Sequence, residues 1–84
     1  MPTFQEAISS AVRTQAARKG LKGTDIAQAV GLSRTAYWRH LTNKVPWSSE
    51  DFDKLASALR LNSAWELMDL ARNEAAISDQ TVAA

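Results

Sequence analysis

The chain has 84 residues, a formal net charge of +1 and no cysteine. This length suits one small domain, so we expect a single domain over residues 1–77 and a flexible tail over residues 78–84. Without cysteine there can be no disulfide framework, no thiolate nucleophile and no cysteine-ligated zinc site. No stretch resembles a signal peptide or a membrane span, so we expect a soluble cytoplasmic protein without a membrane partner.

The charge is distributed unevenly along the chain. Residues 1–44 hold seven basic and two acidic side chains, whereas residues 45–84 hold three basic and seven acidic ones. A strongly basic half favours a negatively charged partner. The alternative is an ordinary solvated surface of mixed charge.

The first predicted helix covers residues 3–19. Thr3 is placed to cap its first turn, Glu6 completes a capping box, and Gly20 follows the last turn. Apolar residues recur at intervals of three and four, which predicts one buried face. These residues are Phe4, Ile8, Ala11, Val12 and Ala16. No segment alternates apolar and polar residues between turn signals, so we expect an all-α fold.

Two short helices are predicted next, over residues 23–30 and 33–42, with Gly31 between them. A helix of two turns is unstable alone, so both must pack on the rest of the domain. The residues spaced for this packing are Ile26, Ala27, Val30, Leu32 and Tyr37. We expect a positive φ at Gly31, which sets the second helix across the first. Ser33 is placed to cap that second helix, and Asn43 to end it in the left-handed conformation.

Two further helices are predicted over residues 49–60 and 63–76, the first of them capped by Ser48 with Asp51. The inner face of the first is expected to be Phe52, Leu55, Ala56 and Leu59. The inner face of the second is expected to be Trp65 and Met68 with Ala71 or Ala75. Trp47, in the connection before them, is also expected in the core. The sequence therefore predicts a compact bundle of five helices.

The helix over residues 33–42 has one cationic face. At about 100° per residue, Tyr37 and Leu41 fall on its inner side, with His40 at the edge. The opposite arc consists of Arg34, Thr35, Trp38, Arg39 and Thr42. Guanidinium groups bind guanine edges or phosphate, and apolar surface fits the thymine methyl group. This face therefore favours double-stranded DNA as the partner.

Two stretches carry a family resemblance, LKGTDIAQAVGLSRTAYWRHLTNK at residues 21–44 and WSSEDFDKLASALRLNSAWELM at residues 47–68. The register of Ala27, Gly31 and Tyr37, followed by the LASAL helix, resembles the helix-turn-helix family of phage repressors and Cro proteins. The resemblance covers about residues 4–71. It implies a lambda-repressor-like DNA-binding domain of five helices, in which the second and third form the helix-turn-helix and the third enters the major groove. It also implies a homodimer on a palindromic operator.

The resemblance also implies two groups of DNA contacts. The positions that read bases or face the groove are Ser33, Arg34, Thr35 and Arg39, with Trp38 beside them. The positions in segments that touch the phosphate backbone are Lys22, Gly23, Thr24, Thr42, Asn43 and Lys44. The chain departs from the family at two places. Lys22 and Gly23 stand where a capping Ser or Thr and a phosphate-binding Gln are common, and Ala16 and Leu41 replace a frequent Arg–Glu pair.

Some of these residues have a second interpretation. The two arginines and Lys44 can be solvated charges. Trp38 either contacts bases and sugars or folds back on the loop at residues 45–47. His40 has no second imidazole or thiolate with which to share a metal ion, so we interpret it as structural and expect neither a metal nor a cofactor.

The last predicted helix also offers a pairing surface. Leu70 and Ile77 project outside its expected inner stripe. A domain with one recognition helix gains affinity by pairing, so we expect these two residues at a homodimer interface.

The leading hypothesis is a sequence-specific transcription regulator that binds double-stranded DNA, similar to a stand-alone phage or prophage repressor or Cro protein in a bacterial or phage-infected cell. The alternative is a DNA-binding antitoxin or anti-regulator that also holds a protein partner through its acidic C-terminal half. We do not expect an enzyme, because a single histidine, no thiol and no phosphate-binding glycine loop offer no catalytic residues.

Overall fold

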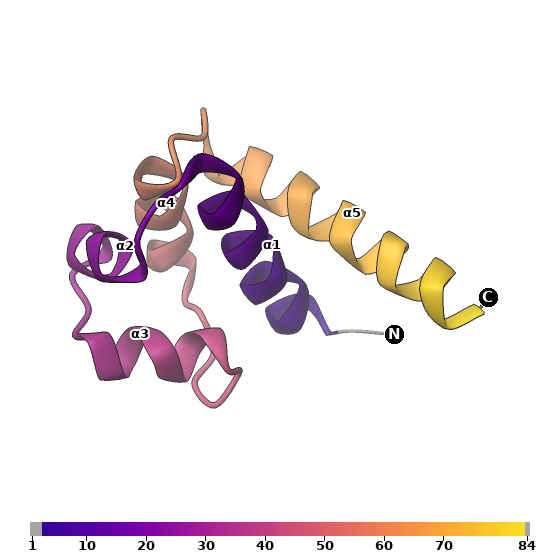
Figure 1. The fold of residues 1–84 in the computed structure, drawn as a ribbon, viewed down its shortest axis with the longest axis horizontal. Coiled ribbons are helices and arrows are strands. Elements are labelled where there is room, and N and C mark those ends of the chain that lie inside the picture. Colours follow the sequence, from indigo (N-terminus) through magenta and orange to yellow (C-terminus); the bar gives the residue numbers. More distant parts are fainter. Residues whose placement is uncertain (1–2, 84) are drawn as a thin grey trace.

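The computed structural model describes residues 3–83, and the side chains of residues 3–77. Five helices follow one another along the chain: α1 (Phe4–Lys19), α2 (Gly23–Val30), α3 (Arg34–Leu41), α4 (Ser49–Ala58) and α5 (Ala64–Ala83). Figure 1 shows α1 in the middle of the molecule, with α5 along one side and α2 and α3 on the other. The predicted all-α architecture of five helices is confirmed.

Side-chain caps set where three of the helices begin. Thr3 Oγ1 accepts a hydrogen bond from the N–H of Glu6 at 3.1 Å, and the Glu6 carboxylate accepts one from the N–H of Thr3 at 3.0 Å. The second of these bonds, from the Thr3 backbone, holds the pKa of Glu6 below its ordinary value. Ser33 caps α3, and Ser48 with Asp51 forms a second capping box at α4. All three predicted caps are confirmed.

The turn between α2 and α3 depends on a left-handed glycine. Gly31 has a φ of 81°, as predicted, and its N–H donates to carbonyl groups in the last turn of α2. The next N–H, of Leu32, donates to Ala27 O at 2.8 Å and closes the turn. A Cβ added at Gly31 would meet nothing within 4 Å, so the need for glycine comes from the backbone conformation alone.

The core lies where α1, α2, α4 and α5 meet. Its most completely buried large side chains are Ile8, Val12, Ile26, Leu55, Leu59 and Leu67. The predicted inner faces of α2 and α4 are confirmed. Their predicted residues are all buried, namely Ile26, Ala27 and Val30 in α2, and Phe52, Leu55, Ala56 and Leu59 in and just after α4. Trp47 is also confirmed in the core, at 4% exposed.

Two aromatic residues that we predicted as buried lie at the surface. Trp65 is 75% exposed and Phe4 is 51% exposed. The phase of α5 explains the first error, because this helix turns Leu67 into the core, whereas Ala71 is buried as predicted. Leu70, predicted to project outward, is half-buried and packs against that core. Phe4 stands at the rim, where its ring meets the Phe52 ring edge to face at 5.8 Å.

The last two helices also end differently from the prediction. α4 stops at Ala58, two residues before the expected end, and Arg60 takes a left-handed φ of 60° just after it. α5 continues to Ala83 instead of ending near residue 76. The side chains of residues 78–84 lie outside the described residues, and the flexibility expected of that tail stays a prediction. Neither α5 nor any other helix in the described part of the chain has the length and apolar composition needed to cross a bilayer.

The conformation of Gly31 gives a test of the turn. Gly31→Ala should lower the free energy of unfolding by about 1 kcal/mol, because alanine must then adopt the left-handed region. Gly23→Ala is the matched control, since its added Cβ would make an ordinary 3.5 Å contact with the Tyr37 ring in a helical conformation. Urea unfolding followed by circular dichroism measures both. Equal changes in stability for the two substitutions would show that the left-handed conformation of Gly31 does not require glycine.

Candidate nucleic-acid interface

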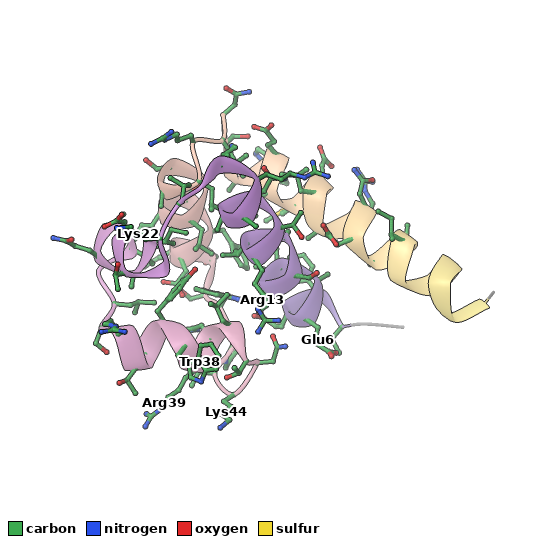
Figure 2. The ribbon with its side chains drawn as sticks, viewed as in Figure 1. Glu6, Arg13, Lys22, Trp38, Arg39 and Lys44 are labelled. Carbon is green, nitrogen blue, oxygen red and sulfur yellow. The ribbon has the colours of Figure 1, made fainter. Side chains whose placement is uncertain are left out.

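Helix α3 has one buried and one exposed side. Tyr37, His40 and Leu41 are buried, at 6%, 8% and 8% exposed. The opposite side consists of four exposed residues, Arg34, Thr35, Trp38 and Arg39. Figure 2 shows the Arg39 side chain on the side of α3 that faces away from the other helices. The division of residues 34–41 into two faces is therefore the predicted one, whereas Thr42, predicted on the outer arc, is half-buried at the end of the helix.

The exposure of Trp38 contradicts one of its two interpretations, the one in which it folds back on the loop at residues 45–47. Its side chain is 61% exposed, whereas packing on the following loop would have buried it. Trp47 fills the space under α3 instead. The Trp47 ring stacks on the His40 ring at 4.6 Å and meets the Tyr37 ring at 6.2 Å. Trp38 therefore belongs to the outer face.

A row of polar side chains on α1 holds the loop that follows α3. We call Gln5, Ser9 and Arg13 the α1 polar row; they recur every four residues and so share one side of that helix. Gln5 Oε1 accepts from the N–H of Trp47 at 2.6 Å, and Gln5 Nε2 donates to Trp47 O at 3.1 Å. The loop backbone is thereby bonded to α1 through both groups of one residue.

Ser9 is the buried centre of the α1 polar row, at 1% exposed. Its hydroxyl accepts from the indole N–H of Trp47 at 3.0 Å. The same hydroxyl can donate its one proton to His40 O at 3.1 Å or to Asn43 Oδ1 at 2.8 Å. One serine therefore connects α1 to the end of α3, to the turn after it and to the core tryptophan.

Arg13 ties α1 directly to the end of α3. Its Nη2 donates to Leu41 O at 2.6 Å. This places a cation at the carboxyl end of α3, where the helix dipole is negative. The bond joins α1 and α3, as the Arg–Glu pair of the resembled family does, but it ends on a backbone carbonyl. Burial raises the pKa of Tyr37, and the nearby Arg13 charge partly opposes that rise.

Sequence reasoning missed the α1 polar row. Its partners are 28 to 42 residues away along the chain, and no local pattern encodes them. The available signal was the polar spacing of residues 5, 9 and 13 beside the buried apolar positions 8 and 12.

A shallow hollow brings many of the predicted contact residues together. It has a volume of about 750 Å³ and lies between the start of α2 and the outer face of α3. Its lining consists of Lys22, Gly23, Thr24, Arg34, Thr35, Tyr37, Trp38 and Leu41. Six of these residues were predicted to touch bases or phosphates, and the other two form its floor.

The start of α2 is open toward this hollow. Lys22 precedes the helix and makes no side-chain cap, so the first N–H groups, at Gly23 and Thr24, remain free to bind an anion. Asp25 is the only acidic residue between residues 20 and 47, a stretch that also holds Lys22, Arg34, Arg39 and Lys44. The hollow and its surroundings are therefore complementary to a polyanion.

The predicted phosphate contacts after α3 are not equivalent. Thr42 Oγ1 donates to Trp38 O at 2.9 Å, and Asn43, with a left-handed φ of 63°, turns its amide oxygen toward Ser9. Their backbone N–H groups, like that of Lys44, donate to carbonyls of α3. The Lys44 side chain is exposed and points away from the protein body (Figure 2). Thr42 and Asn43 shape this loop, and Lys44 offers its charge.

His40 takes the structural position that we expected. It is buried against Trp47, and its Nδ1 atom has no hydrogen-bond partner. Within the described part of the chain, no three His, Cys, Asp or Glu side chains gather as they would around a metal ion.

The fold is that of a known bacterial regulator. Two crystal structures of the clp gene regulator ClgR from Corynebacterium glutamicum match it. One has a TM-score of 0.85 at 24% identity and covers 95% of this chain and 84% of ClgR. The other has a TM-score of 0.77 at 25% identity and covers 87% of this chain and 94% of ClgR. No family profile and no curated protein sequence matches. These likenesses show the lambda-repressor-like helix-turn-helix fold.

Two adjacent serines test the α1 polar row. Ser9→Ala should lower the free energy of unfolding by about 1–3 kcal/mol, because it leaves the buried Trp47 indole N–H unsatisfied. Ser10→Ala removes the same hydroxyl at the next position, where the bond to Glu74 is longer, at 3.3 Å, and only partly buried. It should cost less than about 0.5 kcal/mol. Denaturant unfolding measures the free energy of unfolding of both variants. Similar losses of this free energy would mean that the Ser9 hydroxyl contributes no more to stability than the Ser10 hydroxyl.

Proposed function

We propose that this protein is a sequence-specific transcription regulator that binds double-stranded DNA by placing α3 in the major groove. The observation that carries the proposal is the exposure of Arg34, Trp38 and Arg39 along one side of a helix whose other side is buried. A helix held in this way presents fixed side chains to base edges. The match to ClgR, a gene regulator of the same fold, supports the proposal.

The outer face of α3 offers groups suited to base reading. Arg34 and Arg39 can each bond the O6 and N7 atoms of a guanine, and Ser33 and Thr35 can bond several bases. The Ser33 oxygen already accepts from the N–H of Ala36 at 3.1 Å, but its hydroxyl proton remains able to donate. Trp38 provides a large apolar surface for a thymine methyl group or a deoxyribose.

Phosphate contacts are proposed on both sides of this face. On one side, the free N–H groups at the start of α2 and the Lys22 and Thr24 side chains can hold one backbone phosphate. On the other side, Lys44 can hold another. Thr42 and Asn43 maintain the shape of the loop that carries Lys44. The two contacts would fix the register of α3 in the groove.

We infer further that the protein acts as a stand-alone repressor of the phage or Cro type. It would work in the cytoplasm of a bacterial or phage-infected cell, as a homodimer on a palindromic operator. One short recognition helix contacts few base pairs, so pairing two copies adds both affinity and specificity.

The first experiment selects duplexes from a random library with the wild-type protein and then measures the affinity of variants by fluorescence anisotropy. Arg34→Ala and Arg39→Ala should each weaken binding to the selected duplex by about 1–3 kcal/mol, since each removes a bidentate base contact. Arg18→Ala is the matched control, because this exposed arginine lies in the last turn of α1. It should leave the affinity unchanged.

A scrambled duplex and a salt series complete this test. The arginine variants should lose less affinity on scrambled DNA than on the selected duplex. Affinity should fall with salt with a slope of about 0.9 logarithmic units per neutralised phosphate. No enrichment of any duplex, or equal losses for Arg18→Ala and Arg39→Ala, would refute the proposed function.

A further inference from the structure

A second surface of the molecule carries exposed apolar side chains that the proposed DNA contacts do not use. A hollow of about 500 Å³ lies between the start of α1 and the first three turns of α5. We define the α1–α5 strip by its apolar lining, Phe4, Ala7, Trp65, Met68, Ala71 and Ala75. Asp69 and Arg72 are the charged residues of its lining. The strip therefore combines an apolar floor with one charge of each sign.

The exposure of two aromatic rings makes this strip unlike an ordinary surface. Trp65 is 75% exposed and Phe4 is 51% exposed. A small protein without a partner seldom leaves two large rings beside one apolar hollow. Covering these rings in two copies would remove on the order of 500 Å² from water, about a third of a standard interface. The strip is therefore large enough to be the centre of a contact.

We propose that the α1–α5 strip is the surface through which two copies of this chain pair. A two-fold contact needs a surface that complements itself. The strip meets this need in shape, since each copy offers both a projecting Trp65 and a hollow that can receive the Trp65 of the other copy. It also meets the need in charge, since Asp69 of one copy can face Arg72 of the other.

The charges of the strip argue for a second copy as the occupant. Asp69 and Arg72 form an exposed ion pair in the single chain, with side chains 64% and 78% exposed. Such a pair adds little stability by itself. Across a two-fold axis, the same two residues form two ion pairs between the copies. Because the strip carries no net charge, the two copies do not repel each other there. A strongly acidic or basic partner would find no complementary charge there.

The place of the strip fits the proposed function. In Figure 1, α1 lies between α3 and α5, so a contact through α5 leaves α3 exposed in both copies. The strip depends on the rotation of α5 about its own axis, which leaves Trp65 exposed. Of the two residues predicted at the dimer interface, Leu70 packs against the core, and Ile77 is 59% exposed but does not line the strip, so the contact is assigned to Trp65 and Phe4 instead. This inference deepens the proposed function, because it supplies the pairing that a palindromic operator requires.

Two exposed tryptophans allow a test in which each variant is the control for the other. Trp65→Glu should raise the dimer dissociation constant at least about thirtyfold, the size expected for losing a tryptophan from the centre of an interface. Trp38→Glu, on the outer face of α3, should leave that constant unchanged. Sedimentation velocity over a concentration series measures self-association, and circular dichroism checks that both variants remain folded.

A charge exchange gives a second test on the same strip. Asp69→Arg places like charges opposite each other across the two-fold axis and should weaken pairing about tenfold. The double variant Asp69→Arg with Arg72→Asp restores opposite charges and should recover most of the wild-type association. Failure of the double variant to recover, while it remains folded, would overturn the pairing geometry.

DNA binding separates a failure of this inference from a failure of the proposed function. Trp65→Glu should still bind a duplex that holds a single half-site, whereas Trp38→Glu should lose this binding and still dimerise. A wild-type protein that remains monomeric at the highest soluble concentration would overturn the inference, even if it binds the half-site. A Trp65→Glu variant that pairs as tightly as the wild type would also overturn the inference. In either case the α1–α5 strip would be the binding surface for another molecule, such as the protein partner of an antitoxin.

Discussion

The packing of Trp47 under α3 is the interaction on which the proposed interface depends. α3 has eight residues, too few to form a stable helix by itself. Its inner side chains, Tyr37 and His40, lie on the Trp47 ring, and Trp47 is bonded through its backbone and its indole to Gln5 and Ser9 of α1. The first helix of the chain thereby fixes the third.

This arrangement separates support from recognition within one short helix. The α1 polar row bonds to the carbonyl end of α3 and to the loop after it. These bonds do not depend on which side chains stand on the outer face of α3. Arg34, Thr35, Trp38 and Arg39 make none of these supporting side-chain bonds. Substitutions on the outer face can therefore change the DNA sequence that is preferred with little effect on the fold. Substitutions in the α1 polar row affect both the fold and the DNA preference. Side chains held in advance also lose less entropy when they bind.

Local patterns in the sequence were enough to predict four of the helices closely, because Thr3, Ser33, Ser48 and Gly31 act on their own turns. They also predicted the two faces of α3, since a helix of known start has a known phase. They failed at Trp65, where two overlapping apolar stripes run along α5 and only its packing against α1 and α4 selects the one with Leu67. They failed at Gln5, Ser9 and Arg13 because the bonds of these residues join distant parts of the chain.

The proposed function requires that a DNA duplex binds to the side of α3 that is turned away from Trp47. Amide chemical-shift mapping of the wild-type protein, titrated with the duplex selected from a random library, tests this claim most directly. We expect the largest shifts on the residues around the hollow between α2 and α3 and on the loop at Lys44. Shifts concentrated on α4 or α5, with α3 unchanged, would contradict this claim.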